Sequence, residues 1–557
     1  MAHRRDDDRP MAAVGANVRV VASFSGPTDR RSVLDRAHRG DIEGALGRVA
    51  SSDTGPRRSM RRRLATLLAV MGPGVIVMVA SNDAGGLSVY AQAGQDQGLR
   101  LLWLVVLLAP VLFVTQEMVA RLGAVTGAGH ARLIFERFGR RWGFFALGDL
   151  LLFNALTLVT EFIGVALSLG YFGVSRYVSV PVAAVGLVLV TGTGSFRTWE
   201  RAMYALIGTS LAVIPLALVT HHRHPLVASL ARGASAGPHA GGTLLVMAVV
   251  GATVAPWQLF FHQSNVVDKR VTARWLNYER VDTALGTALF AVGAVCVLVA
   301  CAQALGPLNV PFRDAGRAAA DLKRTAGSWA GGLFAVVLLN GSVLGAGAVT
   351  LATSYAIGDV FGLKHSLHRR RRDAAAFHGS FVLSVALAAA VVLVPGAPLG
   401  VVTVGVQALA GVLLPSATVF LLLLCNDEKV LGPWINPPWL NAVATAVVGA
   451  TLVLSARLTL VTLFPRFHFG AARTVLLGLV TVALGTAVVT SSLSHGRRRQ
   501  PRDETAGRAT WTMPPIDALA PPTPSRPRTL GLAVLRVYLS IAAALAVVKV
   551  IQLMRGG

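Results

Sequence analysis

The sequence predicts an all-α protein that crosses a membrane many times. Of the 557 residues, 54% are hydrophobic and 14% are charged, with a mean hydropathy of +0.59, whereas soluble domains carry about 25% charged residues. Apolar runs that reach the roughly 20 residues needed to cross a bilayer recur along the chain. The net charge is +25, but the arginine clusters adjoin apolar runs. They therefore indicate membrane topology and contact with anionic lipid rather than nucleic-acid binding.

The chain divides into a membrane domain and polar flanking segments. Residues 1–63 are rich in Arg, Asp, Ser and Gly and are expected to form a disordered or loosely ordered cytoplasmic tail without a cleavable signal peptide. Residues 64–492 form the membrane domain. Its predicted spans are about 64–95 (broken), 99–120, 143–170, 177–194, 202–219, 243–266 (broken), 281–304, 328–358, 378–395, 399–424, 439–463 and 472–492. A polar, Pro-rich linker occupies 493–529, and 530–554 is a possible thirteenth span.

The distribution of basic residues predicts the orientation. Loops that follow the even-numbered spans contain 17 Lys and Arg residues, and the alternate loops up to the twelfth span contain 10. Because basic loops stay on the cytoplasmic side, we expect a cytoplasmic N-terminus and a multi-pass location in the cell membrane.

The first span is interrupted by polar residues. Gly72–Tyr90 begins as an apolar helix, and Asn82–Gly86 then places an amide, a carboxylate and two glycines where hydrocarbon should continue. An ionisable residue inside a membrane segment indicates a functional site. The alternative is that Asp83 ends a short helix at the membrane interface.

The sixth span contains a second break. Gly251–Ser264 includes Pro256, which removes a helical hydrogen-bond donor, and the polar residues Gln258 and His262 follow it. An ordinary proline kink is the alternative. The two breaks lie five spans apart, however, and broken helices in corresponding halves are typical of inverted-repeat transporters with a site at the membrane midplane.

Ordered motifs at these breaks and elsewhere resemble the Nramp family of divalent-metal transporters over about residues 66–490. The matching stretches are Gly72-Pro73-Gly74 with Asp83-Ala84-Gly85-Gly86, Ala255-Pro256-Trp257, His262, Thr160–Gly164, Tyr278–Thr283, and Gln407 eight residues before Pro415. The resemblance implies a LeuT-like fold, with two inverted five-helix repeats formed by helices 1–5 and 6–10 and additional C-terminal helices.

The resemblance also implies a metal site. It assigns side-chain ligands at Asp83, at the family's Asn position, which is Gly86 here, and at its Met position, which is Ala255. It adds the backbone carbonyls of Ala80 and Ala252, with Gln407 nearby.

Two of these positions depart from the family pattern. Ala255 lacks the thioether of the family's Met, so the bias toward softer transition metals is removed. The smaller side chains at Gly86 and Ala255 are expected to enlarge the cavity. Since Mg²⁺ commonly keeps several waters, this pattern resembles the Nramp-related magnesium transporters.

The residues associated with proton coupling depart as well. The family's Asp three residues before Glu161 is Leu158 here, and the first histidine of the sixth-span motif is Trp257. Glu161, His262 and Trp257 remain candidates for the ion pathway or for coupling. We therefore expect transport without proton symport.

Alternative functions stay open from the sequence. The closest is a proton-coupled Mn²⁺/Fe²⁺ importer, and a non-transporting membrane receptor on the same fold belongs to another class. No catalytic constellation, cofactor motif, nucleic-acid site or obligate protein partner is recognised, and Cys296, Cys301 and Cys425 lie in apolar runs. The expected substrates are Mg²⁺ and Mn²⁺.

Overall fold

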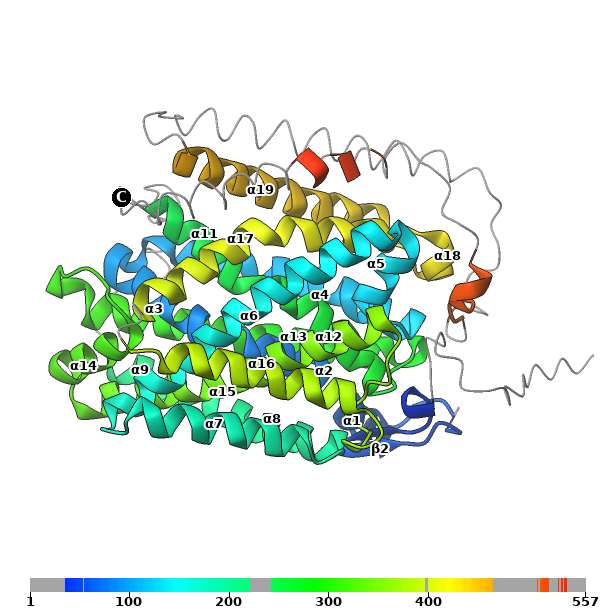
Figure 1. Cartoon of the computed structure of the whole chain (residues 1–557), viewed down its shortest axis with the longest axis horizontal. Helices are drawn as coiled ribbons and strands as arrows, with labels where there is room; N and C mark the ends of the chain where they lie inside the picture. Colours follow the sequence, from blue (N-terminus) through cyan, green and yellow to red (C-terminus); the bar gives the residue numbers. More distant parts are fainter. Residues whose placement is uncertain are drawn as a thin grey trace, which may run out of the picture.

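The computed structural model describes residues 36–53, 55–220, 242–395 and 399–463, together with residue 508, residues 511–519 and a few residues between 529 and 537. Within these ranges, the long helices lie roughly side by side in one bundle (Figure 1). Most of the predicted linker, the twelfth span and most of the possible thirteenth span lie outside the described residues.

Each predicted span up to 439–463 coincides with helical structure. In chain order the helices are α1 (Met60–Val70), α2 (Pro73–Ala80) and α3 (Ala84–Gln97); α4 (Leu102–Thr126); α6 (Arg140–Tyr171); α7 (Arg176–Thr191); α8 (Phe196–Ser210) with α9 (Val213–Val219); α11 (Gly242–Thr253) with α12 (Pro256–Asp268); α13 (Leu276–Ala304); α15 (Ser328–Phe361); α16 (Ala375–Leu393); α17 (Leu399–Leu424); and α19 (Pro438–Leu463). The shorter helices α5 (His130–Phe138), α14 (Ala315–Ala326) and α18 (Glu428–Leu431) lie between them. Among the described residues, nine helical segments are long and apolar enough to cross a membrane, and α1 with α2 would make a tenth.

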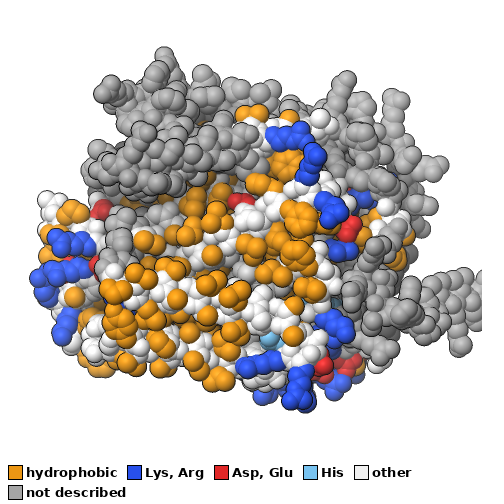
Figure 2. Space-filling view, in the orientation of Figure 1, with side chains coloured by type: hydrophobic (Ala, Val, Ile, Leu, Met, Phe, Trp, Pro, Cys, Tyr) orange, Lys and Arg blue, Asp and Glu red, His pale blue; other side chains and the backbone are white. Residues whose placement is uncertain are grey.

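The surface has the pattern of a protein embedded in lipid. Hydrophobic side chains cover the middle of the visible face, and Lys and Arg gather toward its two ends (Figure 2). Large apolar side chains such as Leu152, Val182 and Leu383 are exposed at mid-helix. Exposed apolar area of this extent marks a surface that contacts another apolar phase.

Both predicted helix breaks are present. The first lies at Ser81–Asp83, between α2 and α3, and the second lies at Val254 and Ala255, between α11 and α12. The sequence did not predict a further bend of 51° between α1 and α2. It falls at Gly72, whose φ of 151° lies in a region that strongly favours glycine.

The expectation of a disordered tail is wrong for the part of 1–63 that is described after residue 35. A 3₁₀ turn (Arg36–His38) and two antiparallel strands, β1 (Ile42–Gly44) and β2 (Gly47–Val49), form a compact hairpin. Ile42 and Val49 are only 3% and 5% exposed. Burial of these apolar side chains against the bundle stabilises a segment whose overall composition is polar.

Candidate metal site at the two helix breaks

Asp83 caps the helix that follows the first break. Its backbone is extended, and its Oδ1 accepts a hydrogen bond of 2.7 Å from the N–H of Gly86. Asp is a preferred N-cap because its carboxylate satisfies an N–H that has no helical partner. The side chain is only 3% exposed, so the alternative of a carboxylate that ends a helix at the interface does not fit.

At the two breaks, the backbone carbonyls of Ala80 and Ala252 lack the N–H partners that they would have in a continuous helix. In a continuous helix, the carbonyl of Ala252 would accept from the N–H of residue 256, but that residue is Pro256 and has none. The N–H that would bond the carbonyl of Ala80 belongs to Ala84, and it donates instead to Glu161 Oε2 at 3.1 Å. The predicted carbonyl ligands therefore stand where the helical ladder is interrupted.

Glu161 lies directly beside Asp83. A Cβ placed on Gly345 of α15 would stand 2.8 Å from both Asp83 Cβ and Glu161 Oε2, so the two side chains share the space that this glycine leaves. Glu161 is fully buried, and its Oε1 has no hydrogen-bond partner among the described residues. The structure thus adds a second carboxylate to the edge of the predicted site.

Gln407 of α17 touches both breaks. A Cβ on Gly85 would collide with the Gln407 side chain, and a Cβ on Gly251 would collide with the Gln407 backbone carbonyl. The side chain is buried and its Nε2 has no recorded partner. The prediction that Gln407 lies near the site agrees with this placement.

Three further hydrogen bonds join the segments at the two breaks. The Tyr90 hydroxyl on α3 lies 3.2 Å from Thr253 Oγ1 at the end of α11. Gln258 of α12 donates from Nε2 to Ser81 Oγ at 2.9 Å and to the Thr253 carbonyl at 3.2 Å. These contacts bring the ends of both breaks together, with Asp83, Ala80, Ala252 and Ala255 around them.

The predicted enlargement of the cavity at Gly86 is not seen in this closed arrangement. A Cβ at position 86 would stand 2.8 Å from the Ser81 carbonyl oxygen and 3.3 Å from Asp83 Oδ1. Ala255 is buried as well. The space beside Gly86 is therefore taken up by neighbouring atoms, and we expect that a hydrated ion requires α2 and α12 to separate.

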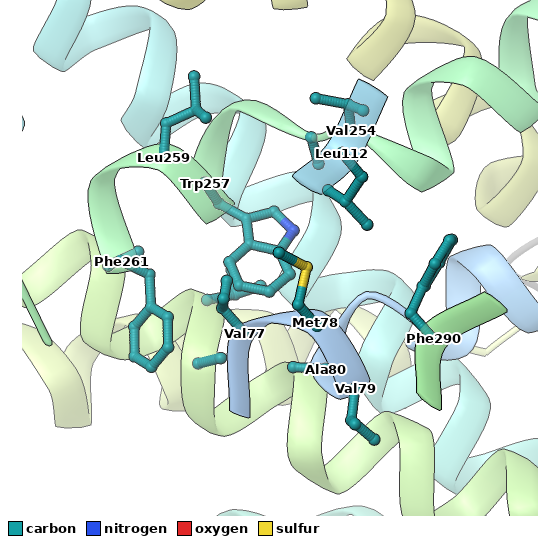
Figure 3. Close-up of a cluster of buried hydrophobic side chains, with 14 of the residues drawn as sticks. Val77, Met78, Val79, Ala80, Leu112, Val254, Trp257, Leu259, Phe261 and Phe290 are labelled. Carbon is teal, nitrogen blue, oxygen red and sulfur yellow. The ribbon is translucent and has the colours of Figure 1, made fainter. Parts of the chain in front are cut away.

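An apolar cluster lies between α2 and α12. Figure 3 shows the indole of Trp257 over Val77 and Met78, with the Met78 sulfur beside the ring. Trp257 is fully buried and its Nε1 has no recorded partner among the described residues. At the position of a family histidine, this side chain fills the space between the two broken helices.

A chain of buried polar side chains, which the sequence did not assign, continues from Gln258. Gln116 Nε2 on α4 donates to Gln258 Oε1 at 3.4 Å, and Gln116 Oε1 lies 2.9 Å from His262 Nδ1. His262 Nε2 is 3.2 Å from Glu279 Oε1 on α13. His262 is therefore a hydrogen-bonded link between helices. Glu279 lies inside the Tyr278–Thr283 motif, and this motif was the only feature of the sequence analysis that pointed to Glu279.

The comparison with protein families decides the identity of the fold. A model of the natural resistance-associated macrophage protein-like family, Nramp, matches residues 74–461. The chain belongs to the Nramp family. The matched range includes both helix breaks and every predicted site residue of this Nramp chain.

Relatives and solved structures agree with this assignment. The Nramp chain is 27% identical over 431 residues to the divalent metal cation transporter MntH of Verminephrobacter eiseniae, covering 72% of this chain and 91% of that protein. It is 30% identical over 399 residues to the MntH of Ralstonia nicotianae, covering 68% and 87%. A crystal structure of the Eremococcus coleocola manganese transporter, in complex with an aromatic bis-isothiourea substituted compound, aligns with a TM-score of 0.59. It shares 20% identity and covers 79% of this chain and 96% of that one.

The family assignment and the fold establish a coarse function. The protein is a multi-span, membrane-embedded divalent metal cation transporter of the Nramp type, with a LeuT-like fold. Its two broken helices are the elements that line the substrate site in transporters built from inverted repeats.

Proposed function

We propose that this Nramp protein imports Mg²⁺, largely hydrated, and also Mn²⁺, by alternating access across the cell membrane. The donor set at the breaks carries the proposal. It consists of the Asp83 carboxylate and the carbonyls of Ala80 and Ala252, while Gly86 and Ala255 supply no donor side chain. Hard oxygen donors suit Mg²⁺, which binds through one or two carboxylates and keeps several waters. Glu161 beside Asp83 can balance the second charge of the ion.

Transport without proton symport forms the second part of the proposal. Leu158 and Trp257 replace two titratable residues of proton-coupled relatives and are both buried. An inside-negative membrane potential favours entry of a dication by about 4.6 kcal/mol per 100 mV, twice the value for a single charge. This gradient is sufficient to drive import without a second ion.

A proton-coupled Mn²⁺/Fe²⁺ importer is the second candidate, and one observation favours it. Asp83 and Glu161 stand side by side in a buried site, and adjacent carboxylates resist simultaneous ionisation. Metal entry between them could therefore displace a proton. The two candidates differ in ion preference and in proton movement.

Competition between ions tests the proposed substrate. In proteoliposomes loaded with a fluorescent Mn²⁺ indicator, millimolar Mg²⁺ outside should block most Mn²⁺ uptake, because both ions use the same oxygen donors. Asp83→Ala should lose Mn²⁺ uptake and Mg²⁺ uptake together. Mn²⁺ uptake that persists at millimolar Mg²⁺ would favour the Mn²⁺/Fe²⁺ importer.

Proton movement is tested in the same vesicles with a trapped pH dye. Mg²⁺ uptake driven by a potassium diffusion potential should leave the internal pH unchanged, apart from the leak of protein-free vesicles. Acidification that follows Mg²⁺ uptake and disappears in Glu161→Gln would refute the uncoupled mechanism.

A further inference from the structure

The N-terminal hairpin, residues 36–53, is seated on one end of the bundle. It lies at the lower right of Figure 1, beside α1 and one end of α8. Its two glycines allow close approach to α1: a Cβ on Gly47 would stand 3.1 Å from Ala69 Cβ, and a Cβ on Gly44 would stand 2.5 Å from the Ala69 carbonyl oxygen. The hairpin is therefore fitted to this surface.

A buried ion pair joins the hairpin to three helices. Lys269, directly after α12, pairs with Glu200 of α8, and both side chains are 0% exposed. Lys269 Nζ also donates to the Met71 carbonyl at the bend between α1 and α2. The other Glu200 oxygen accepts from the N–H of Ala45 at the hairpin tip. Removing one partner of a buried pair leaves an uncompensated buried charge, so loss of either Lys269 or Glu200 would disrupt this end of the bundle.

Arg270 makes a second connection from the end of α12 to the same segment. Its guanidinium donates from Nε to the Ala37 carbonyl at 2.9 Å and from Nη1 to the Asp41 carbonyl at 3.0 Å. Its φ of 65° is unusual for a residue other than glycine. His38 Nε2 lies 3.9 Å from Asp268 Oδ1 at the end of α12.

The helix held at this end leads directly to the metal site. Asp282 of α13 accepts hydrogen bonds from the N–H groups of Gly72 at 3.0 Å and Gly74 at 2.7 Å, at the start of α2. The eight residues of α2 span about 12 Å, and the helix ends at Ala80, a carbonyl ligand of the proposed site. Movement of α2 away from α8 and α12 would open a path between this end and Asp83.

We propose that residues 36–53 form a latch that holds this end of the pathway closed, and that the latch must release before metal can leave the site toward the cytosol. The occupant of the docking surface is the chain's own hairpin, which bridges α1 to α8 and α12. The proposal rests on the transporter function and on the predicted cytoplasmic N-terminus. It gives the cytosolic side a protein element through which transport can be regulated.

The test measures how readily a reagent in the aqueous phase reaches the space between α2 and α12. A reporter, Val77→Cys, is placed in a variant whose three native cysteines are replaced by Ser, because Val77 lies against Trp257 in that space (Figure 3). A membrane-impermeant maleimide is applied to inside-out and to right-side-out vesicles in separate arms. Arg270→Gln removes the hydrogen bonds of the guanidinium to the Ala37 and Asp41 carbonyls. Gly44→Val places a side chain against the Ala69 carbonyl and prevents the hairpin from seating on α1.

The matched control is Arg48→Gln, since Arg48 is exposed and bonds within the hairpin to Asp41. Arg270→Gln and Gly44→Val should each speed labelling in inside-out vesicles about tenfold, the equivalent of about 1.4 kcal/mol in the gate equilibrium. The control should label at the parental rate. Mn²⁺ binding by calorimetry checks that each variant keeps its folded site.

Equal labelling rates in both variants and the control would overturn the latch, and so would faster labelling only in right-side-out vesicles. The labelling rates in the two vesicle orientations do not depend on which metal the protein carries or on proton coupling. A protein that transports Mn²⁺ with protons can still show the latch, and a Mg²⁺ importer without proton symport can still lack it. The two proposals therefore fail separately.

Discussion

At the scale of single residues, the proposed metal site combines two carboxylates with backbone carbonyls, and the positions of the family's Asn and Met ligands supply neither an amide side chain nor a thioether. Asp83 is held by the N–H of Gly86, and Glu161 is held by the N–H of Ala84. Each carboxylate thus uses one oxygen to fix the start of α3, and the Oε1 of Glu161 has no hydrogen-bond partner among the described residues. Met78 of α2 carries a thioether close to the first break, and its sulfur lies beside Trp257 in Figure 3.

Restoring a thioether at the second break tests the basis of ion preference. Ala255→Met places a soft donor at the family's usual position, and soft donors favour transition metals over Mg²⁺. We expect the block of Mn²⁺ uptake by Mg²⁺ to weaken about tenfold, which equals about 1.4 kcal/mol of selectivity.

Met78→Leu is the matched control for the existing thioether. Because its sulfur packs against the indole, this substitution should leave the preference between Mn²⁺ and Mg²⁺ unchanged. If Met78→Leu itself lowers Mn²⁺ affinity relative to Mg²⁺, the assignment of an oxygen-only site is wrong.

At the scale of elements, two broken helices are joined by a few long-range hydrogen bonds. Gln258 is central because it bonds the Ser81 side chain at one break and the Thr253 carbonyl at the other. Through Gln116 the connection continues to His262 and Glu279. This polar chain fixes the relative position of α2, α11, α12 and α13 around the site.

Gln258→Leu should therefore loosen the two breaks without removing a metal ligand. The substitution leaves the Thr253 carbonyl and the Gln116 amide with fewer partners, and an unsatisfied buried polar group costs about 1–3 kcal/mol. We expect a lower thermal midpoint and about tenfold weaker Mn²⁺ binding.

Gln92→Leu controls for loss of a glutamine on a neighbouring helix, since Gln92 bonds only to Asp96 in the recorded contacts. Unchanged Mn²⁺ affinity in Gln258→Leu would show that the polar chain does not position the site.

The connection after α15 provides a pH-dependent contribution to stability outside the membrane spans. Burial of the His365 ring opposes its protonation, but the hydrogen bond and ion pair with Asp359 outweigh this and raise the pKa of His365 from 6.5 to about 9. A raised histidine pKa stabilises the fold fully below pH 6.5, and this contribution is lost as the pH rises through 9.

The thermal midpoint of the purified protein should therefore fall between pH 6.5 and pH 9.5, and it should fall less in His365→Gln. The difference between the two proteins should be about 2 °C or more, since 1 kcal/mol shifts the midpoint of a large domain by about that amount. Parallel curves for the two proteins would contradict the assignment of this ion pair.

At the scale of the whole molecule, features that depend on the local sequence could be predicted, whereas contacts between residues far apart in the chain could not. Apolar length located the spans, and Asp83 and Pro256 located the two breaks, because a polar group or a missing donor interrupts a membrane helix locally. The hairpin was missed because its strands have three residues each, and their stability comes from Glu200 and Arg270, more than 150 positions away.

In the proposed site, too, local features could be predicted and long-range contacts could not. Family resemblance assigned Asp83, Ala80, Ala252 and Gln407 to the proposed site, and these residues lie at or beside the two breaks. Spacing along the chain cannot show that Glu161 lies against Asp83. Nor can it show that Gly86 is closed off by the Ser81 carbonyl. These facts depend on how α3, α6 and α15 pack. The additional bend at Gly72 is likewise set by the Glu200–Lys269 pair, which occupies the space where a side chain would stand.

A high-resolution structure of the protein bound to Mg²⁺, compared with one bound to Mn²⁺, tests the central claim most directly. The account predicts density for Mg²⁺ between Asp83 and the Ala252–Ala255 break, with most protein oxygens more than about 3.5 Å from the ion and water between them. Protein oxygens at about 2.1 Å on all sides, the distance for dehydrated Mg²⁺, would contradict it, as would density for the ion elsewhere in the bundle.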